Sequence, residues 1–508
     1  MTTLKTRIPD LRTIATGLLL VSGLQAHAMQ PVGAPGANPL KEPRRPNILF
    51  IFSDDHSTRA IGTYAKANGF ALKDEDMTPN LDKLAAQGMR MDRVFCTNSI
   101  CTPSRAAVMT GQYRHKNGVP IFNAISTSTP VFTQELQKAG YWTSLVGKWH
   151  LGSNPQGFDH WEIFPGQGAY ENPPMYTAAG KTQHKGYASD ILTDLAIKQL
   201  ENRPKDKPFF LMVNHKAPHR NWIPHPRHAA LYKDRTFATP ATLLDDYATR
   251  TDAIREQEQS LAKHMRPKID LKVDKIPNLP FAERQRWIYN RYMQDYLGCV
   301  RGVDESIGAI LKYLDEHDLA RNTIVAYSSD QGFFLGEHGL YDKRFMYDES
   351  HRMPFIIRWP GVTKPGSASK AMATNCDFAP TFLDAAGIAK PERMQGHSLK
   401  DALAGNPGAD WPKSVYYRYY VKPGDEHNVQ PHYGVRTERY KLIHFWYKDQ
   451  WECYDLQNDP NEIKNIYNDP KAQDIVRQLK TELERIRKEV DDKDEYSTPE
   501  TLPKGPFV

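Results

Sequence analysis

The sequence has no apolar run long enough to cross a membrane, few cysteines and no block of like charge. The apolar stretch from Ile14 to Leu24 is too short to span a bilayer. The 66 basic residues outnumber the 60 acidic ones by only six, and no lysine or arginine run suggests a nucleic-acid-binding tail. We therefore expect no membrane span and no nucleic-acid partner. The mild positive charge is compatible with an anionic ligand.

The five cysteines are too few and too scattered for a disulfide scaffold. They do not cluster with histidines in the pattern of a zinc site. Their number is odd, which in an exported protein indicates that one thiol has a separate fate. Whether any of the others pair stays open. The cysteines are Cys96, Cys101, Cys299, Cys376 and Cys453.

The first 28 residues have the pattern of a secretory signal peptide. Basic residues come first, the apolar run follows, and Ala26-His27-Ala28 is typical of a cleavage site. Residues 29–46 are rich in proline, glycine and alanine and are predicted to be a flexible lead-in. We therefore expect an exported protein, periplasmic or secreted.

Apolar runs of strand length alternate with amphipathic segments, which predicts an α/β fold with a mostly parallel sheet. Strands are expected at 47–53, 89–95, 142–146, 208–214 and 323–328. Helices are expected at 78–87, within the stretch from Cys101 to Gly111, at 131–139, at 187–202 and, in more than one piece, at 281–317. From about residue 411 the pattern changes to short strands and one charged helix, 471–489. We predict a large sheet sandwiched by helices over 47–410, and a small antiparallel sheet with a packed helix over 411–508.

Polar residues follow four of the apolar strands directly. Ligands of parallel sheets bind beyond the carboxyl ends of the strands, so these residues are expected to form one site. Asp54, Asp55, Asp330 and Gln331 supply only oxygen ligands, a set that suits calcium or magnesium and is a poor match for zinc. The basic candidates at strand ends are Lys148, His150 and His219.

The stretch from Cys101 to Gly111 is predicted to be a loop that turns into a helix. Thr102 is expected to cap the helix, Pro103 suits its first position, and Gly111 can close it. Cys101 then lies beside a helix N-terminus, where unpaired N–H groups and the helix dipole favour an anion.

The string Cys-x-Pro-x-Arg followed by Thr110-Gly111 resembles the signature of the formylglycine-dependent sulfatases, type I sulfatases of the alkaline phosphatase superfamily. The resemblance extends from about 47 to 491 and includes the string from Ser329 to Gly339, continuing through Lys343 and Arg344. These strings look most like bacterial sulfatases of polysaccharides and glycosaminoglycans, including those for 6-sulfated N-acetylglucosamine in heparan-type chains and for ulvan. The resemblance implies an alkaline-phosphatase-like fold.

The resemblance also implies a reaction. Cys101 would be oxidised to formylglycine by a formylglycine-generating or sulfatase-maturing enzyme, and the hydrated aldehyde would attack the sulfur of a sulfate ester. A calcium ion, in preference to magnesium, would be bound by Asp54, Asp55, Asp330, Gln331 and the modified Cys101. Gln331 departs from the asparagine or histidine usual in the family. Arg105 would help activate the nucleophile. Four basic residues would hold the sulfate oxygens: Lys148, His150, His219 and Lys343. Of these, His219 or Lys343 would protonate the leaving alkoxide.

We therefore expect an exported sulfatase that acts on a sulfated carbohydrate. A phosphodiesterase or phosphonate monoester hydrolase of the same superfamily is the alternative enzyme, and a catalytically silent protein that binds sulfated glycans is the alternative of another class. His432 and Arg436 are candidate sugar contacts, with domain packing as the other interpretation.

Overall fold

Strand β1 (Asn47–Ser53) lies at the centre of the main sheet, and all its residues are buried. The computed structural model describes residues 45–68, 77–421, 423–424 and 426–503. Arg44–Val508 form one compact unit. The predicted signal peptide and nearly all of the predicted lead-in lie outside the described residues.

The main sheet has ten strands in the order β14-β2-β13-β9-β1-β8-β4-β5-β6-β7. Its central strands β9, β1, β8, β4 and β5 run parallel, β13 is antiparallel to β9, and β6 and β7 add an antiparallel hairpin. This confirms the large, mostly parallel sheet. The strand bounds are β2 Met89–Met91, β4 Trp142–Gly147, β5 His160–Ile163, β6 Pro174–Thr177, β7 Gly180–Gln183, β8 Phe209–Asn214, β9 Thr323–Ser329, β13 Phe355–Arg358 and β14 Ser367–Ser369.

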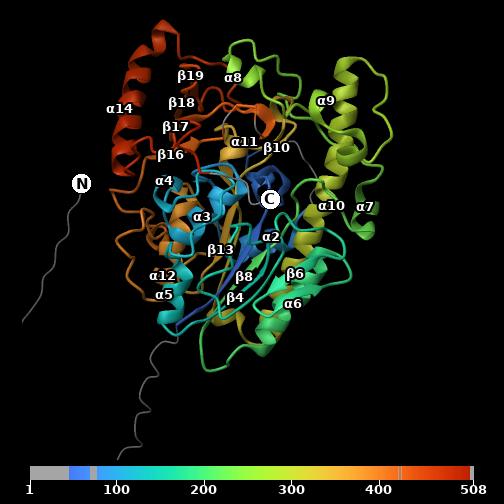
Figure 1. The fold of residues 1–508 in the computed structure, drawn as a ribbon, viewed down its shortest axis with the longest axis vertical. Helices are drawn as coiled ribbons and strands as arrows, with labels where there is room; N and C mark the ends of the chain where they lie inside the picture. The colour runs from blue at the N-terminus through green and yellow to red at the C-terminus, as the bar shows by residue number, and fades with distance from the viewer. Residues whose placement is uncertain (1–44, 69–76, 422, 425, 504–508) are drawn as a thin grey trace, which may run out of the picture. The chain divides into compact units, whose positions relative to one another are not determined.

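Helices cover both faces of this sheet. Alternate residues of β1 point to opposite faces, so each face contributes side chains to a separate core. Ile48, Phe50 and Phe52 pack in one core with α3 (Cys101–Thr110), α5 (Phe132–Lys138) and α12 (Phe378–Ala385). Leu49 and Ile51 pack in the other core with α2 (Pro79–Gln87), α6 (Ala188–Asn202) and α10 (Phe281–Glu316). In Figure 1, α5 and α12 lie on one side of β4 and β8, and α6 and α10 on the other.

Helix α10 is a single helix of 36 residues, so the expectation of several pieces was wrong. Its glycines fit close neighbours. A Cβ on Gly298 would lie 2.6 Å from Pro224 Cβ, and one on Gly308 would lie 2.5 Å from Asn80 Oδ1. These glycines allow close packing and do not end the helix.

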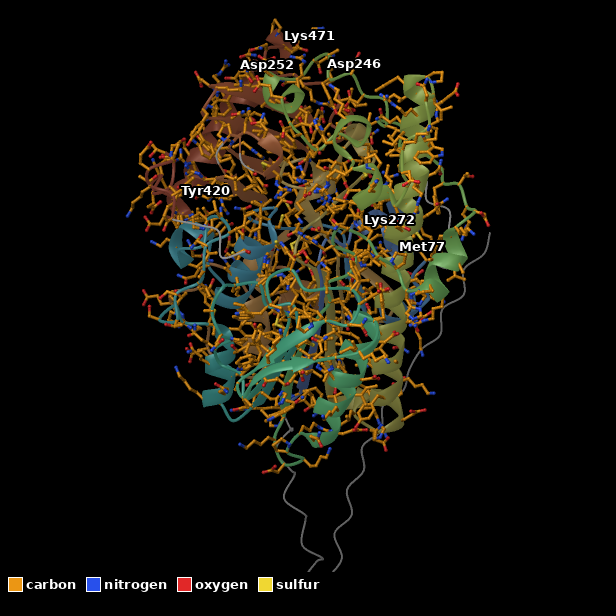
Figure 2. The ribbon with its side chains drawn as sticks, turned by 45° about the vertical axis from the view of Figure 1, so that its right-hand side comes forward. Met77, Asp246, Asp252, Lys272, Tyr420 and Lys471 are labelled. Atoms are coloured by element: carbon orange, nitrogen blue, oxygen red, sulfur yellow. The ribbon has the colours of Figure 1, made fainter. Side chains whose placement is uncertain are left out.

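The insertion, as we call the segment 215–280 between β8 and α10, carries only short elements: α7 (Pro226–Tyr232), α8 (Asp252–Arg255), α9 (Leu261–His264) and the π-helical turn η2 (Pro267–Leu271). One part of it reaches the C-terminal strands, since Gln450 Nε2 donates to Asp252 Oδ2 at 3.2 Å. Another part reaches α10, since Lys272 Nζ lies 3.0 Å from Asp295 Oδ2. Figure 2 shows Asp252 at the top of the view and Lys272 lower, beside α10.

The C-terminal strands form an antiparallel sheet in chain order, as predicted: β16 (Ser414–Tyr419), β17 (His432–Thr437), β18 (Tyr440–Phe445) and β19 (Gln450–Asp455). Helix α14 (Gln473–Glu489) packs on it through Val476, Leu479 and Leu483. This sheet belongs to the same compact unit as the main sheet, and a domain boundary at 410/411 stays a prediction.

Shorter elements complete the described chain, and the bounds of these strands and helices are β3 Val94–Phe95, β10 Phe334–Leu335, β11 Tyr341–Asp342, β12 Arg352–Met353, β15 Ala373–Thr374, α1 Gly62–Asn68, α4 Arg114–Asn117, α11 Asp348–His351 and α13 Lys400–Leu403. The predicted strand 89–95 is therefore two strands, β2 and β3, in different sheets.

Among the described helices, none has both the length and the apolar character that crossing a bilayer requires.

Candidate active site

Cys101 is the first residue of α3, so the helix begins two residues earlier than the expected start at Pro103. The N-cap is Ile100 in extended conformation, and Thr102 lies inside the first turn. The Thr102 hydroxyl donates to the carbonyl of His150 at 3.1 Å, which ties α3 to the end of β4. Gly111 closes the helix in the left-handed conformation, as predicted. All ten residues of α3 are buried.

The predicted polar residues converge because their four strands are neighbours. The order β9-β1-β8-β4 places the carboxyl ends of parallel strands at one edge of the sheet. Asp54 and Asp55 follow β1, and Lys148 follows β4. Lys343 comes from the segment after β11 (Tyr341–Asp342) and also reaches this edge, where its ammonium contacts Asp55.

Each of the three aspartates contacts one cation. Asp54 is paired with Lys148. Asp55 accepts from Lys343 Nζ at 2.6 and 2.7 Å. Asp330 Oδ2 lies 3.1 Å from Arg105 Nε and 3.0 Å from Arg105 Nη2. The site thus holds six buried ionisable side chains, and each carboxyl group has a basic partner.

Cys101 lies within the field of these charges. Burial raises the pKa of its thiol to about 11, although Lys148 and Lys343 act in the opposite direction. At neutral pH the unmodified thiol is therefore protonated, and a protonated thiol is a poor nucleophile.

The carboxyl groups suit a hard cation. Burial and the charge of Asp54 raise the pKa of Asp330 to about 8, and burial raises the pKa of Asp55 to about 6. The side-chain amide of Gln331 donates to Asp55, and Gln331 Oε1 and Asp54 Oδ1 are buried acceptors without a hydrogen-bond partner among the described residues. Carboxylate and amide oxygens are the ligand type that calcium and magnesium prefer, so these buried oxygens fit such an ion.

The two histidines differ in orientation. The Nδ1–H of His219 donates to the carbonyl of Arg220 at 2.7 Å, so the neutral ring presents Nε2, which lies 3.7 Å from Asp55 Oδ2. His150 Nδ1 lies 3.3 Å from the Thr102 hydroxyl. Burial and, for His150, the neighbouring Lys148 hold the pKa of both rings well below the usual value. Asp54, Asp55 and His219 each offer a ligand atom within 4.8 Å of the others.

Backbone geometry sets the approach of β4 to the site. Gly147 has φ +104°, and a Cβ there would lie 2.0 Å from the carbonyl oxygen of Asn214. Asp55 and His150 also have positive φ, 66° and 56°, which is uncommon for residues other than glycine and marks strain held at a functional site.

His432 and Arg436 both lie on β17 of the C-terminal sheet. His432 is fully buried among aromatic rings of Phe345, Tyr417 and Tyr419. Arg436 forms a two-point ion pair with Asp348 at 3.0 and 2.9 Å. These contacts support the packing interpretation, and a role of the two residues as sugar contacts stays a prediction.

Two residues of the site were not predicted. Gln167 Oε1 accepts from Lys148 Nζ at 2.5 Å, and Lys216 Nζ donates to the Gln167 carbonyl at 3.1 Å. Lys216 stands in the string from His215 to His219 that follows β8, so its position gave a signal. Gln167 lies in an irregular loop, where periodicity carries no signal.

Comparison with known proteins identifies the family. The family model described as Sulfatase matches residues 46–388, and the one described as N-sulphoglucosamine sulphohydrolase, C-terminal, matches 336–489. An N-acetylglucosamine-6-O-sulfatase of Bacteroides thetaiotaomicron is 43% identical over 516 aligned residues, covering 92% of this chain and 91% of the relative. An ulvan-active sulfatase of Formosa agariphila is 26% identical over 468 residues, covering 89% and 83%.

A solved structure of a protein in complex with its substrate, D-glucosamine-2-N,6-O-disulfate, matches with a TM-score of 0.84 at 43% identity, covering 89% of this chain and 99% of the other. The sulfatase family model alone spans well over half of the 508 residues. The chain therefore belongs to the sulfatase family, whose members are sulfuric ester hydrolases.

Proposed function

We propose that this sulfatase removes the 6-O-sulfate from a glucosamine-type residue of a heparan-type glycan. The observation that carries the proposal is the 43% identity to an N-acetylglucosamine-6-O-sulfatase over nearly the whole of both chains. The similarity to the ulvan-active relative is much lower, at 26%, and ulvan is accordingly the second candidate substrate. Export to the periplasm or medium belongs to the same proposal.

The nucleophile in this proposal derives from Cys101 by oxidation to formylglycine. The raised pKa of the buried thiol supports the proposal, because an unmodified Cys101 would be protonated and weakly reactive at neutral pH. The hydrated aldehyde supplies a hydroxyl group that can attack sulfur and later release sulfate by re-forming the carbonyl. A formylglycine-generating or sulfatase-maturing enzyme is the implied partner.

Calcium is the proposed metal, with Asp54, Asp55, Asp330 and Gln331 as its protein ligands. The two buried acceptors without partners, Asp54 Oδ1 and Gln331 Oε1, support this assignment. The cation would supply positive charge that lowers the pKa of the attacking hydroxyl and neutralises the sulfate oxygens.

The basic residues provide the rest of the chemistry. Lys148 and His150 are proposed to donate to sulfate oxygens, and Arg105 fixes Asp330 while placing its positive charge near residue 101. His219 and Lys343 both lie beside Asp55. One of them is proposed to protonate the departing sugar oxygen, since both carry a side-chain nitrogen beside the metal-binding carboxylate.

A substrate panel tests the proposal. Sulfate release is measured from glucosamine 6-O-sulfate, N-acetylglucosamine 6-O-sulfate, glucosamine N-sulfate and ulvan oligosaccharides. We expect release from the two 6-O-sulfates, with kcat/KM at least tenfold above that for the others. A clear preference for ulvan would replace the proposed substrate while leaving the enzyme class unchanged.

Two controls address the other candidate activities. An aryl phosphonate assayed beside an aryl sulfate should be the poorer substrate by kcat/KM. Cys101→Ala should abolish turnover, whereas a silent glycan-binding protein would show no turnover to lose. The tryptic peptide Val94–Arg105 should first be weighed, because an unmodified Cys101 would make every negative assay uninformative.

A further inference from the structure

The loop of residues 164–173 connects β5 with β6 and contacts the segments that follow β4 and β8. Gln167 is its contact with β4: its Oε1 accepts from Lys148 Nζ at 2.5 Å. Lys148 is fully buried, and its second partner is Asp54. Gln167 itself is only half-buried. The loop therefore places a neutral acceptor on a catalytic-site ammonium that solvent does not reach.

Further contacts hold this loop against the segment that follows β8. Lys216 Nζ donates to the carbonyl of Gln167 at 3.1 Å and lies 5.0 Å from the centre of the Tyr170 ring. The Tyr170 hydroxyl donates to the carbonyl of His219 at 2.5 Å. Lys216 thus holds the Gln167 carbonyl, and Tyr170 joins the loop to His219. These contacts limit the positions that the Gln167 side chain can take.

The geometry at Lys148 has a directional consequence. An ammonium group has three N–H donors. Asp54 takes one and Gln167 takes another, so the remaining donor points along a fixed third direction. With Asp54 as the sole partner, the ammonium could rotate about the Cε–Nζ bond and would be drawn toward the carboxylate.

We propose that Gln167 is a positioning residue for Lys148, setting the direction of the donor that meets a sulfate oxygen. This rests on the proposed role of Lys148 in sulfate binding. The amide suits the task better than a carboxylate, because a neutral acceptor orients the ammonium without adding negative charge where an anion binds.

The test compares Gln167→Leu, Lys148→Ala and the double variant. Kinetics on the 6-O-sulfated sugar are combined with the affinity for inorganic sulfate measured by calorimetry. Loss of a hydrogen bond to a charged group corresponds to roughly 1.5–3 kcal/mol, so we expect Gln167→Leu to weaken sulfate binding and kcat/KM by about 10- to 100-fold. In the Lys148→Ala background the same change should have less than a twofold effect, because the residues act as a unit.

Gln156→Leu is the matched control, since Gln156 is also half-buried and its amide makes only a long contact, 3.5 Å, to the Ser126 carbonyl. A purely structural role would lower the melting temperature and the active fraction but leave sulfate affinity unchanged. If Gln167→Leu folds poorly, Gln167→Asn, which is too short to reach Lys148, replaces it.

Different results would refute the proposed role of Lys148 in sulfate binding and the positioning role of Gln167. Wild-type sulfate affinity in Lys148→Ala would refute the role of Lys148 itself. Loss of affinity in Lys148→Ala, with wild-type affinity in Gln167→Leu, would refute the positioning role alone. An equal effect of Gln167→Leu with and without Lys148 would also refute it, because Gln167 would then act on sulfate by another route.

Discussion

Arg105 joins the helix that carries Cys101 to two neighbouring strands. Its Nε and Nη2 meet Asp330 after β9, and its Nη1 donates to the carbonyl of Lys148 after β4 at 2.9 Å. The guanidinium also lies 5.1 Å from the centre of the Phe52 ring. A planar group with donors in several directions is needed for these contacts, which a lysine ammonium cannot all reproduce.

Arg105→Lys should therefore impair catalysis more than folding. We expect kcat/KM to fall by about 100-fold, roughly 2.7 kcal/mol, because positive charge stays near Asp330 while the link to β4 is lost. Steady-state kinetics and thermal unfolding measure the two effects. Arg485→Lys on α14 is the control, and a loss of less than threefold in Arg105→Lys would contradict the argument.

At the scale of elements, the close approach of β4 to β8 depends on Gly147. A side chain there would require both an unfavourable φ and displacement of the Asn214 carbonyl, which lies 2.0 Å from the Cβ position. Asn214 in turn donates from its side chain to the Lys148 carbonyl at 2.8 Å. The backbone at Lys148 can therefore take its observed position because Gly147, one residue earlier, has no side chain.

Gly147→Ala should destabilise the protein and lower its sulfatase activity together. Backbone strain alone costs about 1–3 kcal/mol, and the contact with Asn214 adds to it. Gly140→Ala provides the comparison, because Gly140 also has positive φ, +88°, but its Cβ would meet nothing within 4 Å. Urea unfolding of both variants measures the difference, and equal destabilisation would show that the close approach is unimportant.

The insertion before α10 is anchored by a buried charge cluster. Asp245 lies 2.8 Å from His338 Nδ1 and 2.5 Å from Arg250 Nη1. Burial acts to raise the pKa of Asp245, but His338 and Arg250 outweigh it and lower the pKa to about 2. Because the folded-state pKa lies below the unfolded value of about 3.9, this carboxylate stabilises the fold above pH 4, and the contribution is lost as pH falls toward 2.

Asp245→Asn should remove that part of the acid sensitivity. The expected contribution at pH 7 is about 1–2 kcal/mol after allowance for solvent screening. Urea unfolding at pH 7, 5, 4 and 3 should therefore show the wild type and the variant converging as pH falls. A constant difference down to pH 3 would mean that the Asp245 carboxylate does not titrate as argued.

Strand ends were predictable from the sequence because each buried strand is a continuous apolar run with polar residues directly after it. Asp54, Lys148 and Asp330 illustrate this signal, which is local. The start of α3 was not predicted correctly, because the Thr102 hydroxyl bonds to His150, which is distant in sequence. The unbroken course of α10 and the contact of Gln167 likewise depend on neighbours that only the folded chain brings together.

At the scale of the whole molecule, one carboxylate joins the C-terminal sheet to the main fold. Asp348 of α11 meets Arg436 of β17 and, at 2.8 Å, Lys441 of β18, while its backbone N–H donates to Glu462 at 2.7 Å. The charge of Arg436 serves the junction between two sheets.

Asp348→Ala should loosen this junction without altering the chemistry. Two buried cations would lose a carboxylate, and we expect a destabilisation of about 2–4 kcal/mol, allowing for the partial exposure of Asp348. Asp449→Ala, at a side chain that is 88% exposed, should change stability little. Differential scanning calorimetry compares them; a large change in KM for Asp348→Ala would indicate that the junction also shapes the active site.

The burial of all of α3 limits when another enzyme could modify Cys101. Only 1% of Cys101 is accessible in the folded chain, and the residues around it are closed in by four strand ends. An enzyme that modifies a residue has to reach it, so if Cys101 is oxidised as proposed above, the oxidation has to come before folding is complete. Under that proposal, a chain that folds first would stay in the thiol form, and maturation enzyme supplied afterwards would not convert it.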